Sequence, residues 1–326
     1  MKDFKDICRM RQPEVKAYMD AYLAANEYSP ISEDGFLYAK GDVPVLLVAH
    51  MDTVHKNKCT EIVEKDGKIS SPQGIGGDDR CGVFMIMNVI KEHHCSVLLC
   101  EDEEIGCVGA SKFCKTEYIK NLDVNYMIEF DRKGSTDAVY YSCVNKDFET
   151  FVNDNTGYKS AFGSFSDISR LAPAAKVAAV NLSCGYYKAH SLEEYVVYDE
   201  MMETIEAAKN LITAECDVPF EYRERKEYMM PKNTSGYNNY NYNSNYAYGD
   251  NYSLFDDNYM AMLKMQRTRK KVEDDTYLEL EVVAEDTDGN EFIFYAKGKS
   301  KADCWADLFL TYTHLSYDAI TDYSFI

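Results

Sequence analysis

The stretch Ala49–Lys56, AHMDTVHK, places a histidine and an aspartate two residues apart, directly after the apolar run VPVLLV. Such a run is typical of a buried strand. Because positions i and i+2 of a strand point to the same side, His50 and Asp52 project together from its carboxyl end, where open α/β sheets bind ligands. Two interpretations fit: a polar pair that satisfies itself in the core, and a metal-binding histidine oriented by a carboxylate.

Two acidic stretches follow. In GIGGDDRCG, Gly74–Gly82, the glycines permit a tight turn before Asp79 opens a helix, and a helix N-cap carboxylate would explain that stretch alone. In CEDEEIGCVGA, Cys100–Ala110, four acids follow an apolar strand. Such a cluster repels itself unless cations lie among the acids. A solvated acidic loop is the alternative, but the buried strand before it favours a position at the sheet edge beside His50.

Two further stretches complete the pattern. Asp131 follows an apolar strand in MIEFDRKG, and His190 lies in YYKAHSLEEY after a strand expected over 176–182. Imidazole and carboxylate ligands at several strand ends, with no thiolate among them, favour zinc, cobalt or manganese in a catalytic site.

The elements that must position these side chains alternate between strands and helices, which predicts an α/β fold with a mostly parallel sheet and helices on both faces. Strands are expected over 36–40, 43–49, 96–100, 124–130, 138–143 and 176–182, helices over 13–26, 79–93, 166–171 and 198–214, and a hairpin over 61–70.

With these motifs in order, the chain resembles the co-catalytic di-zinc exopeptidases, a clan that includes TET-type and glutamyl aminopeptidases and the acetylornithine deacetylase and carboxypeptidase relatives. The resemblance rests on AHMDTV, GGDDRCGV, EDEEIGCVGA, EFD, FGSFSD and YYKAHSLEE, and covers residues 13–214. The D-D-R-x-G and E-E-I-G-x-x-G-A forms are most similar to TET-type aminopeptidases. Residues 217–326 resemble nothing we recognise.

The resemblance implies two divalent metal ions, zinc or alternatively cobalt or manganese. It assigns His50 and Asp131 to one ion, and Glu104 and His190 to the other. Asp79 would bridge the two, and is preferred to Asp78 because the run from Asp79 to Gly82 matches the clan's spacing.

The remaining roles follow from the same resemblance. Asp52 would orient the His50 ring, and Glu103 would be the general base. Asp131 is preferred to Glu129 as a ligand because it lies two residues further out from its strand. Tyr186 or Tyr187 is a candidate hydroxyl donor to the oxyanion.

The chain departs from these relatives in its insertions. TET-type enzymes carry an extra domain between the first two motifs, but only 29 residues separate His50 from Asp79. The deacetylase relatives insert a lid after the fourth motif, but only 36 residues separate Asp131 from Asp167. We therefore expect a bare catalytic domain over 1–216.

After this domain the composition changes. Residues 237–252 hold six Tyr and six Asn, so we expect a linker over 217–255 and a small α+β module over 256–326. In this module we expect helices over 260–271 and 301–313 and strands over 277–283 and 292–296. The Tyr/Asn segment could alternatively be an interaction segment. The module is expected to dock on the catalytic domain or on a second copy, which leaves a homo-oligomer open.

Composition limits the partners. The net charge of −20 argues against nucleic acid and anionic membranes, and no run approaches the roughly 20 apolar residues of a membrane span. Eleven scattered cysteines without a C-x-x-C pair predict reduced thiols and a cytoplasmic location.

Three functions remain open. The first is a metal-dependent exopeptidase, an aminopeptidase or dipeptidase that acts on short peptides. The second is an N-acyl amino-acid deacylase, which would use the same metals and water with a different pocket. The third is a non-catalytic interaction protein on a peptidase fold.

Overall fold

The computed structural model describes residues 2–163, 165–224, 278–285, 291–298, 304 and 320–325. It divides the chain into two units, Met1–Glu227 and Tyr228–Ile326, which are described separately below. Most of the expected linker and the helices expected over 260–271 and 301–313, apart from Cys304, lie outside the described residues.

The first unit is built on an eight-stranded sheet with the order β1-β2-β6-β3-β7-β10-β8-β9. Its strands are β1 Ile31–Glu33, β2 Phe36–Ala39, β3 Val43–His50, β6 Cys95–Cys100, β7 Tyr126–Arg132, β8 Asp137–Val139, β9 Lys159–Ala161 and β10 Ala179–Ser183. The central strands β6, β3, β7 and β10 run parallel, so their carboxyl ends meet at one edge. The expected mostly parallel α/β fold is confirmed.

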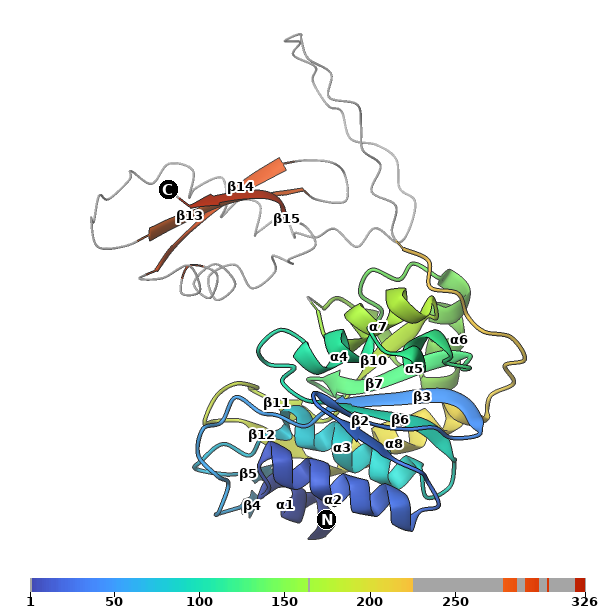
Figure 1. The fold of residues 1–326 in the computed structure, drawn as a ribbon. Coiled ribbons are helices and arrows are strands. Elements are labelled where there is room, and N and C mark those ends of the chain that lie inside the picture. The colour runs from blue at the N-terminus through green and yellow to red at the C-terminus, as the bar shows by residue number, and fades with distance from the viewer. Residues whose placement is uncertain are drawn as a thin grey trace. The chain divides into compact units, whose positions relative to one another are not determined.

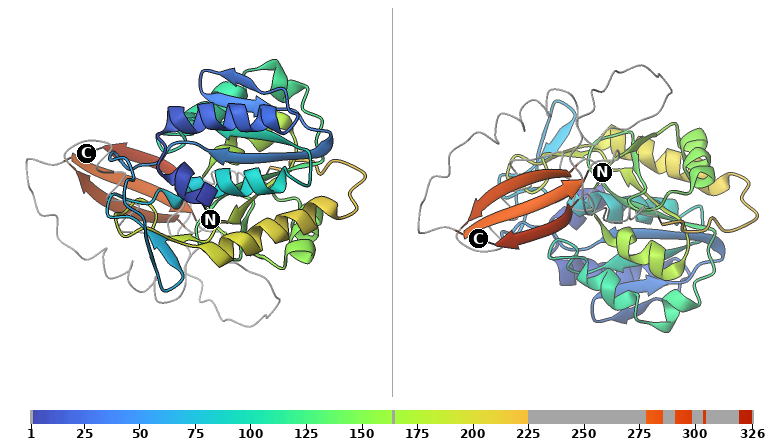
Figure 2. Two further views of the ribbon diagram at one scale, coloured as in Figure 1. Left: turned by 90° about the horizontal axis from the view of Figure 1, so that it is seen from below. Right: turned by 90° about the horizontal axis from the view of Figure 1, so that it is seen from above.

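Helices cover both faces of this sheet (Figures 1 and 2). One hydrophobic core includes residues of α1 Lys2–Cys8, α2 Gln12–Ala25, α3 Gly77–Val89, α6 Lys146–Thr156 and α8 Tyr198–Thr213. A second core, on the other face, includes residues of α4 Val108–Phe113, α5 Glu117–Lys120 and α7 Asp167–Ala175. Of these, α1, α4, α5 and α6 were not expected from the sequence.

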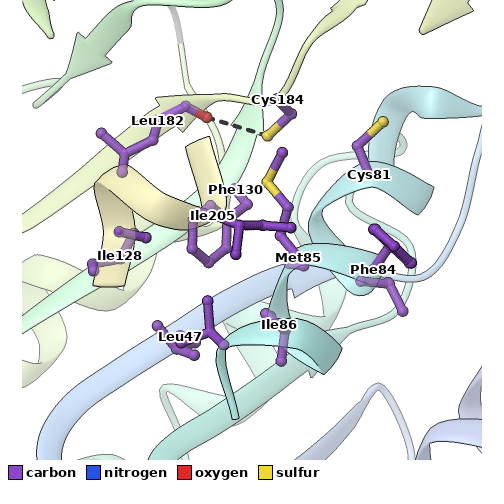
Figure 3. Packing of buried hydrophobic residues seen from close by; sticks show 14 of the residues in the cluster. Leu47, Cys81, Phe84, Met85, Ile86, Ile128, Phe130, Leu182, Cys184 and Ile205 are labelled. Atoms are coloured by element: carbon purple, nitrogen blue, oxygen red, sulfur yellow. Dashed lines mark hydrogen bonds between the residues drawn. The ribbon is translucent and has the colours of Figure 1, made fainter. Parts of the chain in front are cut away.

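The packing around α3 fixes the helix that begins at the acidic pair. Figure 3 shows its side chains against strands β3, β7 and β10 and helix α8; it labels Leu47, Cys81, Phe84, Met85, Ile86, Ile128, Phe130, Leu182, Cys184 and Ile205. All of these side chains are buried. Burying a large apolar side chain contributes about 1.5–3 kcal/mol, so this contact anchors α3 firmly on the sheet.

A second, four-stranded sheet lies at the start of α3, with the order β11-β12-β5-β4. Its strands are β4 Val63–Lys65, β5 Lys68–Ser70, β11 Tyr186–Tyr187 and β12 Tyr195–Val197. The hairpin expected at Asp66 and Gly67 is present, and both residues have positive φ, as a type I′ turn requires. The loop between β11 and β12 carries His190.

Residues 217–224, the beginning of the expected linker, pack on the first unit. Phe220 donates its backbone N–H to the carbonyl of Asn125 and accepts from the N–H of Ala178, both at 2.8 Å. Its ring lies 5.1 Å from that of Phe148 and 5.0 Å from that of Phe151, measured between centroids. The first folded unit therefore extends beyond residue 216.

The described part of the second unit is a three-stranded antiparallel sheet with the order β14-β13-β15. Its strands are β13 Leu278–Glu285, β14 Glu291–Gly298 and β15 Ile320–Phe325, the last of which was not expected. Leu280, Val282, Phe294 and Ala296 are buried, which is the alternation that a half-buried sheet requires.

The sequence led us to expect no membrane-spanning segment and reduced cysteines. Among the described helices, none has the length and apolar character needed to cross a bilayer. The cysteines from Cys8 to Cys216 are all free thiols.

Candidate metal centre

Five elements bring histidines and carboxylates to the carboxyl edge of the sheet. His50 is the last residue of β3, Asp131 lies near the end of β7, and Glu104 follows β6. Asp78 lies in the first turn of α3, and His190 lies in the loop between β11 and β12. The first cluster is His50, Asp78 and Asp131, and the second is Asp78, Glu104 and His190. Within each cluster the potential ligand atoms lie within 4.8 Å of one another.

His50 is buried with acceptors on both sides of its ring. Nδ1 lies 3.1 Å from Oδ1 of Asp52, whereas Nε2 lies 3.0 Å from Oδ1 of Asp78 and 3.5 Å from Oδ1 of Asp131. A neutral ring that donates from Nδ1 directs its Nε2 lone pair at carboxylate oxygens. The first cluster therefore needs a positive charge, either a second ring proton or a metal ion.

Asp78 joins the two clusters. Its Oδ1 faces His50, and its Oδ2 lies 3.2 Å from Nε2 of His190. The same Nε2 lies 3.0 Å from Oε2 of Glu104. These two carboxylates raise the pKa of His190 to about 10, the hydrogen bond with Asp78 being the larger cause. Each oxygen of Asp78 thus serves a different histidine.

The donor set fits two divalent ions. Ligands about 2.0–2.1 Å from a tetrahedral zinc lie roughly 3.3 Å apart, and the histidine-to-carboxylate separations given above, 3.0–3.5 Å, bracket that value. Oε1 of Glu104 is buried, and no residue that the structure describes forms a hydrogen bond with it. A buried carboxylate oxygen that lacks a partner is costly unless a cation lies beside it. Imidazole and carboxylate donors suit zinc, cobalt and manganese alike.

Asp79, the residue expected to bridge the ions, occupies a different position. Its Oδ2 accepts the backbone N–H of His50 at 3.1 Å, and its Oδ1 accepts that of Gly82 at 2.8 Å. It belongs to neither cluster. The structure therefore corrects the choice between the two aspartates: Asp79 ties the start of α3 to the end of β3, and Asp78 faces the histidines.

Gly82 is needed for this arrangement. A Cβ at this position would lie 2.1 Å from the carbonyl oxygen of Phe130 and 2.5 Å from Oδ2 of Asp79. Any larger residue would push α3 away from the end of β7 and displace the carboxylate of Asp79.

Asp52, the residue expected to orient His50, lies on the Nδ1 side of the ring. Besides the ring it accepts the backbone N–H groups of Glu103 at 3.0 Å and Glu104 at 3.1 Å. Burial alone would raise the pKa of Asp52, but these hydrogen bonds and the nearby ring outweigh it and lower the pKa. The ionised carboxylate of Asp52 thus positions the ring of His50 in the first cluster and the backbone of Glu104 in the second.

Asp131 is held by Ser166 and Asn181, which were not assigned from the sequence, and by Tyr186, which was assigned another role. Ser166 Oγ donates to its Oδ2 at 2.6 Å, and the side chain of Asn181 accepts its backbone N–H at 2.9 Å. The hydroxyl of Tyr186 lies 3.3 Å from its Oδ1. The hydroxyl of Tyr187 instead donates to Glu200 at 2.6 Å, so of the two tyrosines only Tyr186 contacts the centre.

Glu103 is buried beside the clusters. Its Oε1 accepts a hydrogen bond from Cys107 Sγ at 3.5 Å. Burial raises the pKa of Glu103 to about 9, and the charge of Asp131 acts in the same direction. Burial also raises the pKa of Asp167, to about 7. Glu129 is buried deeper in β7, where one oxygen accepts the N–H of Ile168 at 3.3 Å.

Glu194 holds the glycine-rich turn through hydrogen bonds to its backbone. Its buried carboxylate accepts the backbone N–H groups of Gly76 and Asp78, both at 3.0 Å, and pairs with His55 Nε2 at 2.8 Å. Ser166 and Glu194 lie in the FGSFSD and HSLEE stretches, so their motifs were recognised although their contacts were not.

Comparisons with known proteins agree with this architecture. No family model and no curated protein sequence matches the chain. Solved structures do match, at 12–14% sequence identity.

The chain is compared with three matching structures whose TM-scores are above 0.5. Aminopeptidase PepT from Bacillus cereus matches at 0.54 and 14% identity, over 65% of this chain and 96% of that one. A tripeptidase from Staphylococcus aureus matches at 0.53 and 12%, over 64% and 95%. An aminopeptidase from Desulfurococcus kamchatkensis matches at 0.51 and 14%, over 66% and 94%. The chain therefore shares the fold of these three peptidases.

Proposed function

We propose that the chain is a di-metal exopeptidase that hydrolyses short peptides, with one ion held by His50, Asp78 and Asp131 and the other by Asp78, Glu104 and His190. The observation that carries this proposal is the carboxylate of Asp78, which offers one oxygen to each histidine. The peptidase fold, with known aminopeptidases and a tripeptidase among its neighbours, supports the choice of reaction.

When bound, two such ions lower the pKa of water toward neutrality and polarise the scissile carbonyl. The chain's own contribution is proton transfer and positioning. Glu103 takes the proton of the attacking water as the new C–O bond forms, and delivers it to the amine as the C–N bond breaks. Its raised pKa would keep it protonated without cations, and positive charge in the adjacent clusters opposes that shift.

Positioning falls to the residues behind the ligands. Asp52 fixes which nitrogen of His50 faces the cluster, and Ser166 with Tyr186 fixes the carboxylate of Asp131. Because these partners are themselves buried or half-buried, His50 and Asp131 are largely pre-organised to bind metal.

The test is a substrate screen on the full chain, before and after removal of metal with a chelator and reconstitution with zinc, cobalt or manganese. We expect hydrolysis of di- and tripeptides that is lost on chelation and restored by metal. Turnover of N-acyl amino acids alone would identify a deacylase. Hydrolysis of neither class by the metal-loaded protein would leave the non-catalytic interpretation.

A further inference from the structure

A cavity of about 500 Å³ opens beside the second cluster. Glu104 of the second cluster and Asp52, which contacts His50, line it, so the cavity adjoins the candidate metal centre, although the other four proposed ligands are not part of its wall. Most of the remaining wall comes from the segment between α1 and α2, the loop after β3 and the glycine-rich turn before α3, and Asp102 and Ile105 come from the segment after β6. A substrate whose scissile bond reaches the centre can therefore extend into this cavity.

The acids of the cavity wall are already engaged. Asp52 accepts three hydrogen bonds from the site itself. Asp102 accepts the side-chain amide of Gln12 at 3.0 Å, and Gln12 accepts the backbone N–H of Asp102 in return. Glu104 faces His190. Asp52 and Asp102 are thus engaged by neighbouring groups, and Glu104 is assigned to the second cluster, so none of these three carboxylates is left for a cationic group of a substrate.

Two cations of the wall are available, whereas the guanidinium of Arg80 is buried and donates to the carbonyls of Met51 and Met10. Arg11 and Lys56 are exposed, and neither side chain forms an ion pair with any residue that the structure describes. Lys58 also lines the cavity, and its Nζ forms an ion pair with Oε2 of Glu14 at 2.9 Å. Unpaired cations beside one cavity contrast with the chain's net charge of −20. Charge complementarity therefore favours an anionic group in this cavity.

The apolar part of the wall limits what carries that group. Ile105, which follows Glu104, is 75% exposed, and Val54 is 39% exposed. An aliphatic segment can contact these two side chains while its charged end reaches the cations.

From these contacts we propose that the cavity binds a free carboxylate of the substrate through Arg11 and Lys56. This proposal rests on the proposed function and narrows it: the preferred substrates are short peptides with a carboxylate close to the scissile bond. The carboxylate can be the C-terminus of a tripeptide or an acidic side chain, since the same cations serve both.

The experiment compares three peptides on the full-length, metal-loaded protein: trialanine with a free C-terminus, its C-terminal amide, and Ala-Ala-Asp amide. The variants are Arg11→Ala, Lys56→Ala and the double variant. Lys40→Ala is the matched control, because Lys40 is exposed and follows β2 at the opposite edge of the sheet.

We expect the wild type to prefer the two peptides that carry a carboxylate. Losing partly exposed charge pairs should lower their kcat/KM by roughly threefold to tenfold in the double variant, while the amide of trialanine changes less than about twofold. The difference should shrink as salt concentration rises. If kcat/KM falls for only one of trialanine and Ala-Ala-Asp amide, that peptide identifies the source of the carboxylate, and this result also supports the proposal.

Equal loss with all three peptides, or no loss, overturns the proposed carboxylate site while leaving the peptidase activity intact. Failure of the wild type to hydrolyse any of the three overturns the proposed function, and this inference with it. Circular dichroism of each variant excludes misfolding as the cause of a loss, and Lys40→Ala should match the wild type on all three peptides.

Discussion

His50 and Asp52 are two residues apart in the chain, and their side chains meet at 3.1 Å between Nδ1 and Oδ1. The same carboxylate accepts the backbone N–H groups of Glu103 and Glu104. Asp52 therefore couples the ring of His50 to the segment that carries the candidate base and a ligand of the other cluster.

Replacing Asp52 with asparagine should weaken metal binding by roughly 10- to 100-fold, as loss of a ligand's orienting partner typically does. The asparagine amide has only one oxygen that can accept a hydrogen bond. Its NH2 group would therefore face one of the N–H groups that the Asp52 carboxylate now accepts. Competition with a chromophoric chelator measures this affinity.

The matched control is Asp42→Asn, because Asp42 also pairs with a histidine ring, His94, at 2.9 Å but at the opposite end of β3. It should leave metal affinity unchanged. Equal affinities for wild type and Asp52→Asn would remove Asp52 from its positioning role.

Glu103→Gln should retain bound metal and lower kcat by about 10²- to 10⁴-fold, because glutamine cannot take the proton of the attacking water. Steady-state kinetics together with elemental analysis of the same sample separates these effects. Glu101→Gln is the control: it lies in the same acidic run, but its carboxylate is held by Lys16 and the backbone of Gly35. A Glu103→Gln enzyme that keeps more than about a tenth of wild-type kcat would contradict the assigned role.

The strand-end placement of the site could be predicted from the sequence because apolar runs and strand alternation are local signals. His50, Asp131 and the Glu103–Glu104 pair each follow a run whose burial the composition reveals. Parallel pairing then brings those ends together. The mostly parallel sheet could be predicted for the same reason.

The choice between Asp78 and Asp79 could not be predicted, because it depends on backbone angles. Asp78 has φ −82° and ψ 100°, and Asp79 has φ −121° and ψ 49°, so neither residue is helical although both belong to the first turn of α3. Helical spacing therefore does not say which carboxylate faces the histidines. Tyr186 and Tyr187 pose the same problem, since neighbouring strand residues point to opposite faces.

The end of the first unit also could not be predicted from the sequence. Residues 217–224 are charged and contain proline, which is typical of a linker, yet Phe220 packs against a cluster of aromatic rings. A single aromatic anchor in a polar segment gives no periodic signal.

Phe220→Ala should lower the free energy of unfolding of the first unit by about 2–3 kcal/mol, somewhat less than for a fully buried phenylalanine because this side chain is half-buried. Val218→Ala is the control, since Val218 is 68% exposed and should change stability by less than about 0.5 kcal/mol. Chemical denaturation monitored by circular dichroism compares the two. Indistinguishable stabilities would mean that residues 217–224 do not belong to the folded unit.

The central claim is that the carboxylate of Asp78 is shared by two metal ions. The most direct measurement is the metal content, by elemental analysis after dialysis, of the wild type, Asp78→Asn and Asp79→Asn, each checked for native secondary structure. We predict two equivalents of zinc, cobalt or manganese in the wild type, at most one in Asp78→Asn, and two in Asp79→Asn. A wild type with only trace metal, or an Asp78→Asn protein that retains both equivalents, would contradict this account.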